Sequence, residues 1–159
     1  GLVDREAVRI EELGRVGDLP EPTTLADFAR GLHANLPATA SGIRVAGPPD
    51  GRVSRVAVLG GAGDSSFGAV RASGADVYVT ADLRHHPALE AREEAAVTGG
   101  TPYLVDAGHF ASESLWLPGL ATRLVSELGT AAARLEIHLS QVRTDPWDFV
   151  LGAAGPEQP

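Results

Sequence analysis

Residues 101–117 read T-P-Y-L-V-D-A-G-H-F-A-S-E-S-L-W-L and predict a strand, a turn and the start of a helix in immediate succession. The apolar run 102–105 has strand character, and residues 106–108 form the turn. His109 and Glu113 then stand four residues apart, on one face of the predicted helix. An imidazole nitrogen and a carboxylate oxygen presented in this way can share one divalent metal ion. Ordinary surface His–Glu pairs have the same spacing, so spacing alone leaves both interpretations open.

Short apolar runs with strand character alternate with segments of helical periodicity through most of the chain. The predicted strands are residues 43–46, 53–59, 76–80, 101–106 and 135–140, with a short strand or turn at 14–18. The predicted helices are residues 25–36, 67–73, 88–97 and 111–128. This alternation predicts an α/β fold, a layered sheet of mostly parallel strands with helices on its faces.

The ends and interruptions of these elements also follow from the sequence. Pro20 and Pro22 indicate an element boundary, and Thr24 with Asp27 has the spacing of a capping box. Pro118 should kink or restart the long helix at residues 111–128. The stripe expected to face the core from this helix consists of Leu120, Leu124 and Leu128.

Residues 60–66, G-G-A-G-D-S-S, connect a predicted buried strand to a helix. Glycines allow close backbone approach, and a helix N-terminus favours an anion. The stretch is not a P-loop, because the chain has no Lys, and Ser66 stands where a dinucleotide fingerprint needs its third Gly. One interpretation is therefore a pocket loop that holds an anionic part of a substrate, and the other is a tight turn capped by Asp64 or Ser65. In the first interpretation the substrate-binding residues are Gly61, Gly63 and Ser65.

The histidines differ in what their positions predict. His85 and His86 follow the strand at residues 76–80, at the edge where α/β folds place ligand sites, and one of them can face a pocket. His33 is predicted to lie on the surface of its helix, and His138 to be a residue of the strand at 135–140.

The amino-acid composition argues against several classes of partner and of catalytic site. All 13 basic residues are Arg and the net charge is −8, which argues against nucleic acid polymers or anionic membranes as partners. The chain has no Cys, so it has no thiolate metal ligand and no cysteine nucleophile. No apolar stretch approaches the length of a membrane span, and the first 25 residues do not resemble a signal peptide. The expected location is the cytoplasm.

Several segments, in this order and spacing, resemble those of one known family. They are G-R-V-G-D-L-P-E-P-T-T-L-A-D-F-A at 14–29, G-G-A-G-D-S-S at 60–66, G-A-D-V-Y-V-T-A-D-L-R-H-H at 74–86, D-A-G-H-F-A-S-E at 106–113 and S-Q-V-R-T-D-P-W at 140–147. The chain resembles the dinuclear-metal-centre hexameric family (NGG-interacting-factor-three-like), often labelled GTP cyclohydrolase I type 2.

The resemblance implies a two-domain α/β protein that assembles into a homohexamer, with two divalent metal ions per full-length subunit, from the set Zn, Fe, Mn, Co or Ni. It implies that His109 and Glu113 are metal ligands and that His86 is a pocket residue or general acid/base. The family's other ligands match no stretch of this chain, which would supply only part of the site. The implied organisation is a connecting arm at 1–13, the second α/β domain at 14–105, a segment at 106–150 that completes the metal-bearing first domain, and a flexible tail at 151–159.

Three function hypotheses remain open. The first is a metal-dependent hydrolase, possibly a GTP cyclohydrolase type 2 homologue, acting on a nucleotide or a related anionic small molecule. The second is a non-catalytic hexamer that handles metal or binds a protein partner. The third is a structural α/β domain with a vestigial site.

Overall fold

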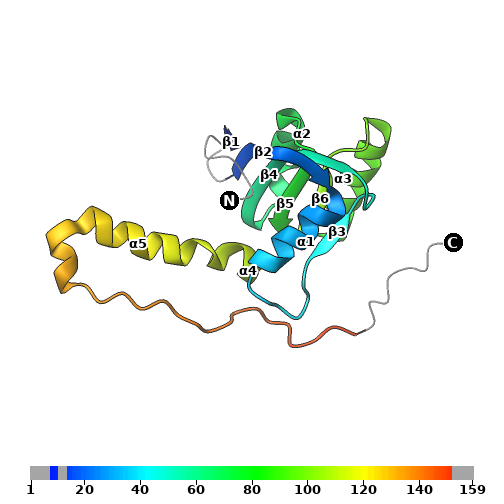
Figure 1. Cartoon of the computed structure of the whole chain (residues 1–159). Helices are drawn as coiled ribbons and strands as arrows, with labels where there is room; N and C mark the ends of the chain where they lie inside the picture. Colours follow the sequence, from blue (N-terminus) through cyan, green and yellow to red (C-terminus); the bar gives the residue numbers. More distant parts are fainter. Residues whose placement is uncertain (1–7, 11–13, 152–159) are drawn as a thin grey trace.

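The computed structural model describes residues 8–10 and 14–151 (Figure 1). Within these residues, six strands form one sheet in the order β1-β2-β4-β5-β6-β3. The strands are β1 (Val8–Ile10), β2 (Gly14–Thr24), β3 (Arg44–Ala46), β4 (Arg52–Ala62), β5 (Val77–Ala81) and β6 (Tyr103–Asp106). The α-helices are α1 (Leu25–Asn35), α2 (Phe67–Ser73), α3 (His85–Val97), α4 (His109–Ser114) and α5 (Trp116–Leu128). Two 3₁₀ turns complete the described elements, η1 (Asp64–Ser66) and η2 (Gly129–Arg134).

The sheet is parallel at its centre and antiparallel at its edges. Strands β4, β5 and β6 are parallel neighbours, joined by crossovers that contain α2 and α3. Strands β1 and β2 continue the sheet antiparallel on one side, and β3 pairs antiparallel with β6 on the other. The α/β prediction is confirmed, with the refinement that the parallel pairing is confined to the middle of a mixed sheet.

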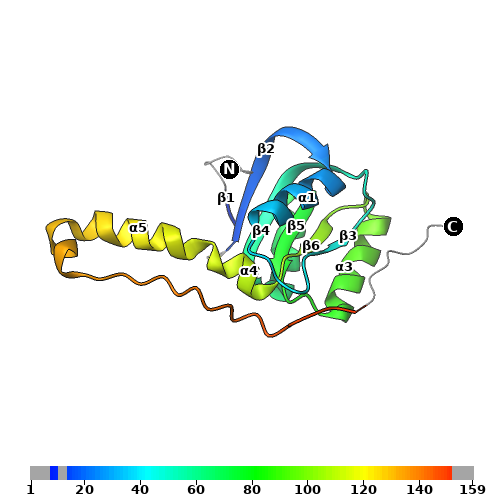
Figure 2. The ribbon, with the colours of Figure 1, turned by 60° about the horizontal axis from the view of Figure 1, so that its bottom comes forward.

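Helices cover both faces of the sheet (Figure 2). Alternate residues of a strand point to opposite faces, so β5 can supply both cores. Tyr78 packs in one core with residues of α2 and α3, while Val77 and Val79 pack in the other with α1. All five residues of β5 are buried, as expected of a central strand with both faces covered.

The start of α1 confirms the predicted capping box: the Thr24 hydroxyl accepts from the Asp27 amide at 3.1 Å. The boundary predicted at Pro20 and Pro22 is only partly right, because β2 continues through both prolines to Thr24. The register between β2 and β4 shifts between Asp18 and Thr23, around these prolines. A proline has no amide hydrogen to donate, so the two residues interrupt the ladder without ending the strand.

The long helix restarts as predicted near Pro118: α4 ends at Ser114 and α5 begins at Trp116. The predicted core stripe is wrong, because no residue of α5 is buried. Figures 1 and 2 show α5 projecting away from the sheet, with the following chain returning beside it.

The strand predicted at residues 135–140 is also wrong, because this segment has no regular secondary structure. An alternating pattern forms a strand only where another strand can pair with it, and none of the described strands does so here. His138 is accordingly an exposed residue, 2.9 Å from the Glu136 carboxylate. His33 is on the surface, as predicted.

The ends of the chain are described only in part. Of the predicted arm at 1–13, the described residues Val8–Ile10 form strand β1. Residues 152–159, the greater part of the predicted tail, lie outside the described residues. The division into two domains stays a prediction. In the described part of the chain, every helix is too short or too polar to cross a membrane.

Gly63 offers a test of how tightly the parallel centre is packed. A Cβ added there would lie 2.0 Å from the Thr80 hydroxyl oxygen and 2.3 Å from the Tyr78 hydroxyl oxygen. We expect Gly63→Ala to lower the free energy of unfolding by about 1–3 kcal/mol, because the buried strand β5 must shift. Chemical denaturation measures this change.

Gly68→Ala is the matched control, because a Cβ at Gly68 meets no atom within 4 Å and the residue lies in α2. Alanine has the higher helix propensity, so this variant should gain roughly 0.5–1 kcal/mol. Equal stabilities of the two variants would contradict the packing described here.

Candidate metal site

The candidate site lies where the parallel strands end. Strands β5 and β6 run in the same direction, with Thr80 opposite Asp106, so the loops that follow them leave the sheet at one edge. The Ala107 amide donates to the Thr80 carbonyl at 2.8 Å, which holds the second loop against the end of β5. Open α/β sheets commonly bind ligands at this edge.

The carboxylate of Asp106, almost fully buried, joins these two loops. One oxygen accepts from the Leu83 amide at 3.0 Å and also pairs with the Arg44 guanidinium. The other oxygen accepts from the Gly108 amide at 3.1 Å, one residue before α4 begins. The position of the loop after β5 is therefore fixed relative to the first residue of α4.

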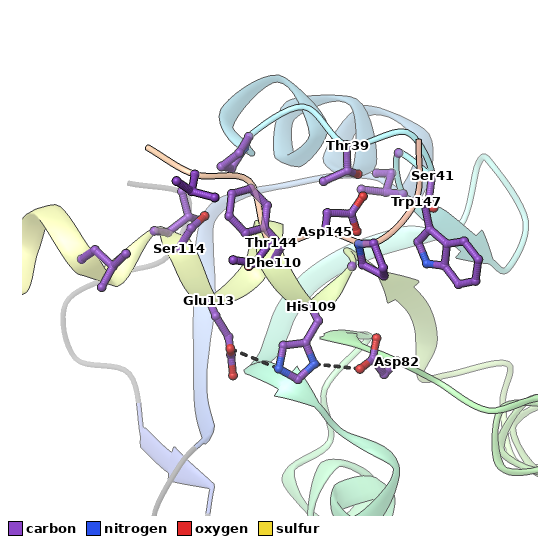
Figure 3. A pocket seen from close by; sticks show the side chains of 18 of the residues that line it. Thr39, Ser41, Asp82, His109, Phe110, Glu113, Ser114, Thr144, Asp145 and Trp147 are labelled. Atoms are coloured by element: carbon purple, nitrogen blue, oxygen red, sulfur yellow. Dashed lines mark hydrogen bonds and ion pairs between the residues drawn. The ribbon is translucent and has the colours of Figure 1, made fainter. Parts of the chain in front are cut away.

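His109, the first residue of α4, lies between two carboxylates (Figure 3). Its Nδ1 is 2.7 Å from Asp82 Oδ2, and its Nε2 is 3.1 Å from Glu113 Oε2. All three side chains are about half exposed, so the cluster is open to solvent ions. The predicted i,i+4 arrangement of His109 and Glu113 is present, and Asp82 is a third member that the sequence analysis did not identify.

These neighbours favour the protonated imidazole. The pKa of His109 is raised above its ordinary value of 6.5, chiefly by the hydrogen bond to Asp82 and further by the negative charges of Glu113 and Asp82. Partial burial opposes this shift. A positive charge is thus stabilised at this position, whether it is carried by a proton or by a metal ion.

The His109–Glu113 pair fits a divalent cation. Two ligand atoms that each lie about 2.0–2.2 Å from one ion are roughly 2.8–3.6 Å apart in octahedral or tetrahedral geometry, and the observed separation is 3.1 Å. Asp82 lies on the other ring nitrogen, so it does not face the same point. Among the described residues, no three His, Cys, Asp or Glu side chains converge on one metal position.

A groove of about 1440 Å³ runs beside the cluster. Its walls come from α4, the start of α5, residues 37–44 and the irregular segment 139–150. Figure 3 shows Asp82, His109 and Glu113 in a row, with Asp145 and Trp147 on the other side of the groove. The ionisable lining side chains are mostly acidic: Asp82, Asp106, Glu113 and Asp145, with Arg44 and His109.

The glycine stretch has a structural role beside this cluster. Gly61, with a φ of +74°, passes beneath Glu113: an added Cβ would lie 2.6 Å from Oε1 of that residue. The amide groups of Gly61 and Gly63 donate to Ser112 Oγ and to the Ala81 carbonyl, at 3.1 and 3.2 Å. Ser65 is exposed on η1. The substrate-binding role of Gly61, Gly63 and Ser65 stays a prediction.

The expected caps of the following helix are not formed. Neither η1 nor α2 has a side-chain cap, and Asp64 instead pairs with Arg84 across the loops. Asp64 thereby connects the end of the glycine stretch to the start of α3.

His86 lies apart from the groove. Helix α3 begins at His85, three residues earlier than predicted, so both histidines lie in its first turn. Both are exposed, with ring centroids 5.3 Å apart, and neither lines the groove. A catalytic role for His86 stays a prediction. Within the same A-D-L-R-H-H stretch, the residue that contacts His109 is Asp82.

Comparisons with family models and with known proteins point to the same family. Residues 2–146 match the family described as Duf34/NIF3 (NGG1p interacting factor 3). The chain is 48% identical over 137 residues to a Mycobacterium leprae protein named GTP cyclohydrolase 1 type 2 homolog, covering 86% of this chain and 34% of that protein. It is 46% identical over 142 residues to a Streptomyces coelicolor protein of the same name, covering 89% and 48% of the two chains.

A solved structure agrees in fold. The crystal structure of a Bacillus cereus protein related to NIF3 superposes with a TM-score of 0.71 at 34% identity, over 86% of this chain and 36% of that one. This chain spans between a third and a half of the length of these relatives. The family resemblance seen in the sequence is confirmed: the chain belongs to the Duf34/NIF3 (NGG1p interacting factor 3) family.

Proposed function

We propose that this chain contributes to a metal-dependent hydrolase that acts on a nucleotide or a related anionic small molecule. The observation that carries the proposal is the 3.1 Å separation of His109 Nε2 and Glu113 Oε2 beside the groove at the strand ends. The names of the relatives, GTP cyclohydrolase 1 type 2 homologs, make GTP the first nucleotide to examine.

His109 and Glu113 would hold the metal, and the remaining ligands of a dinuclear centre would come from parts of the protein outside this chain. Mixed imidazole and carboxylate ligands suit Zn, Fe, Mn, Co or Ni. A bound divalent cation supplies Lewis-acid chemistry, which polarises a substrate oxygen and makes water a stronger nucleophile at neutral pH. The homohexamer that the resemblance implies is part of the same proposal.

The charge of the groove makes metal a requirement for an anionic substrate. Among the described residues, four carboxylates and a single arginine line it, and that arginine, Arg44, is already paired with Asp106. Without metal, such a surface repels phosphates. Divalent ions at His109 and Glu113 would reverse this local charge.

Aromatic side chains could hold the base of a nucleotide. Trp116 and Trp147 both line the groove and are more than half exposed, and Phe110 of α4 lines it as well. Flat aromatic faces bind nucleobases by stacking with little sequence preference. The groove could therefore bind the phosphates of a nucleotide through metal and its base through aromatic side chains.

A non-catalytic role in metal handling or protein interaction is the second candidate. It is favoured by the apolar side chains that α5 and the returning segment leave exposed, among them Trp116, Val125, Leu128, Val142 and Phe149. Metal-dependent turnover of GTP by the full-length protein would favour the hydrolase. Metal exchange without turnover, or partner binding that survives His109→Ala, would favour this second role.

Metal binding by the chain itself is the first test. We expect calorimetry to show one weak Zn²⁺ or Mn²⁺ site per chain, weakened at least about tenfold by His109→Ala or Glu113→Ala. Loss of an outer-sphere partner typically lowers metal affinity by about 10–100-fold, and loss of a ligand should lower it at least as much. His138→Ala is the matched control, because His138 lies 2.9 Å from Glu136 in an exposed pair outside the groove. If all three variants bind like the wild type, the site is vestigial.

The pH dependence of metal binding follows from the neighbours of His109. The metal must displace a proton whose pKa is raised by Asp82 and Glu113, so the apparent affinity should fall by about tenfold per pH unit below that pKa. Above it, the affinity should level off, and the plateau should begin above pH 6.5. Calorimetric titrations from pH 5 to 9 measure the profile, and a plateau that begins below the ordinary histidine value would be inconsistent with this site.

Tryptophan fluorescence reports on the groove, since the two tryptophans of the chain, Trp116 and Trp147, both line it. We expect GTP to quench this fluorescence in the presence of Zn²⁺ and to have little effect after chelation, because the acidic groove needs the cation. A tryptophan solution with the same additions corrects for absorption by the nucleotide. Equal quenching in the metal-free protein, or in His109→Ala with Zn²⁺, would rule out metal-dependent binding.

A further inference from the structure

The two carboxylates beside His109 impose a condition on its ring. A neutral imidazole carries one N–H group, whereas an ionised carboxylate can only accept hydrogen bonds. His109 faces Asp82 through Nδ1 and Glu113 through Nε2, so the neutral ring satisfies only one of these contacts with a proton. The other contact requires a second proton or a cation.

The distances favour the Asp82 contact as the one with the proton. Nδ1 and Asp82 Oδ2 are 2.7 Å apart, within the range of a charge-assisted hydrogen bond, whereas Nε2 and Glu113 Oε2 are 3.1 Å apart. The longer separation lies within the range expected for two ligands of one cation. An imidazole that donates one N–H to a carboxylate and binds metal through its other nitrogen is a common arrangement in metal sites.

The backbone holds Asp82 in place for this contact. Asp82 has a φ of +52°, and among the described residues no other non-glycine residue has a positive φ. The flanking residues are fixed, since the Ala81 carbonyl accepts from the Gly63 amide at 3.2 Å and the Leu83 amide donates to Asp106 at 3.0 Å. Strained backbone of this kind persists where the surroundings over-determine it, and it is concentrated at functional sites.

We propose that Asp82 is a positioning residue: it holds the His109 ring as the Nδ1–H tautomer and thereby directs the Nε2 lone pair to the metal position shared with Glu113. The inference rests on the proposed metal site and adds a residue that is not itself a ligand. The competing explanation is a surface ion pair in which Asp82 accompanies a protonated His109 and has no effect on the neutral ring.

Two variants separate these explanations. Asp82→Gly removes the carboxylate, and glycine adopts a φ of +52° without strain, so the backbone can stay in place. Asp82→Asn removes the charge but keeps an acceptor oxygen, and asparagine also tolerates this backbone conformation. Glu136→Gln is the control, because it alters a carboxylate 2.9 Å from another histidine, His138.

The first readout is the tautomer of His109 in the metal-free protein, from the ¹⁵N shifts of the ring at a pH where it is neutral. We expect Nδ1–H in the wild type, retention in Asp82→Asn and a shift toward Nε2–H in Asp82→Gly. The second readout is the Zn²⁺ dissociation constant, which should rise about 10–100-fold in Asp82→Gly, less in Asp82→Asn and not at all in Glu136→Gln.

The inference is overturned if the wild-type ring is Nε2–H, or if Asp82→Gly changes neither the tautomer nor the Zn²⁺ affinity. A shifted tautomer with unchanged affinity would also overturn it, since the positioning would then have no consequence for metal. Failure of the proposed function is recognised separately: His109→Ala and Glu113→Ala would leave Zn²⁺ binding unchanged, while the tautomer measurement would still decide whether Asp82 orients the ring.

Discussion

The Asp106 carboxylate is the contact on which the candidate site depends. Its oxygens accept from the amides of Leu83 and Gly108, and so connect the residue after Asp82 to the residue before His109. Beside this carboxylate, a backbone bond from the Ala107 amide to the Thr80 carbonyl joins the ends of β5 and β6. A buried carboxylate of this kind is stable only if its lone pairs are satisfied, so the Arg44 guanidinium completes the arrangement. The 2.7 Å contact between Asp82 and His109 is a consequence of that geometry.

The same arrangement concentrates negative charge. Asp82, Glu113 and Asp145 lie along one groove in a chain whose net charge is already −8. Like charges that face one another raise the free energy of the folded state unless a cation compensates them. His109, with its raised pKa, can supply that compensation as a proton carrier, and a divalent ion can supply it more fully. Protonation and metal binding are therefore competing ways to stabilise one cluster, which is why the pH profile reports on the metal site.

Sequence reasoning succeeded where the information is local. The strand, turn and i,i+4 pair at residues 101–113 follow from periodicity and spacing within a few residues, and so does the cap at Thr24. Asp82 was missed because its contact with His109 joins residues 27 positions apart, on loops that only the sheet brings together. In this stretch, the sequence analysis assigned a possible functional role to His85 and His86 instead. Both lie exposed in the first turn of α3. The alternating pattern at 135–140 does not form a strand, because none of the described strands pairs with this segment. A local pattern cannot predict such pairing.

Helix α5 also shows what a local pattern cannot predict: the helix forms, but nothing in its sequence specifies what packs against its apolar face. Its sequence has the leucine periodicity of a helix that packs against a core, and the helix forms, yet Leu124 and Leu128 are exposed. Amphipathic periodicity determines which face of a helix is apolar but does not determine what covers that face. This chain spans between a third and a half of the length of its relatives, so these relatives contain as much polypeptide again, or more, beyond the matched part. A surface that is apolar by sequence and exposed in this chain is where such additional polypeptide would gain most by packing. The groove begins at the base of the same helix, next to Trp116, so polypeptide that packs on the first turn of α5 would also approach His109 and Glu113.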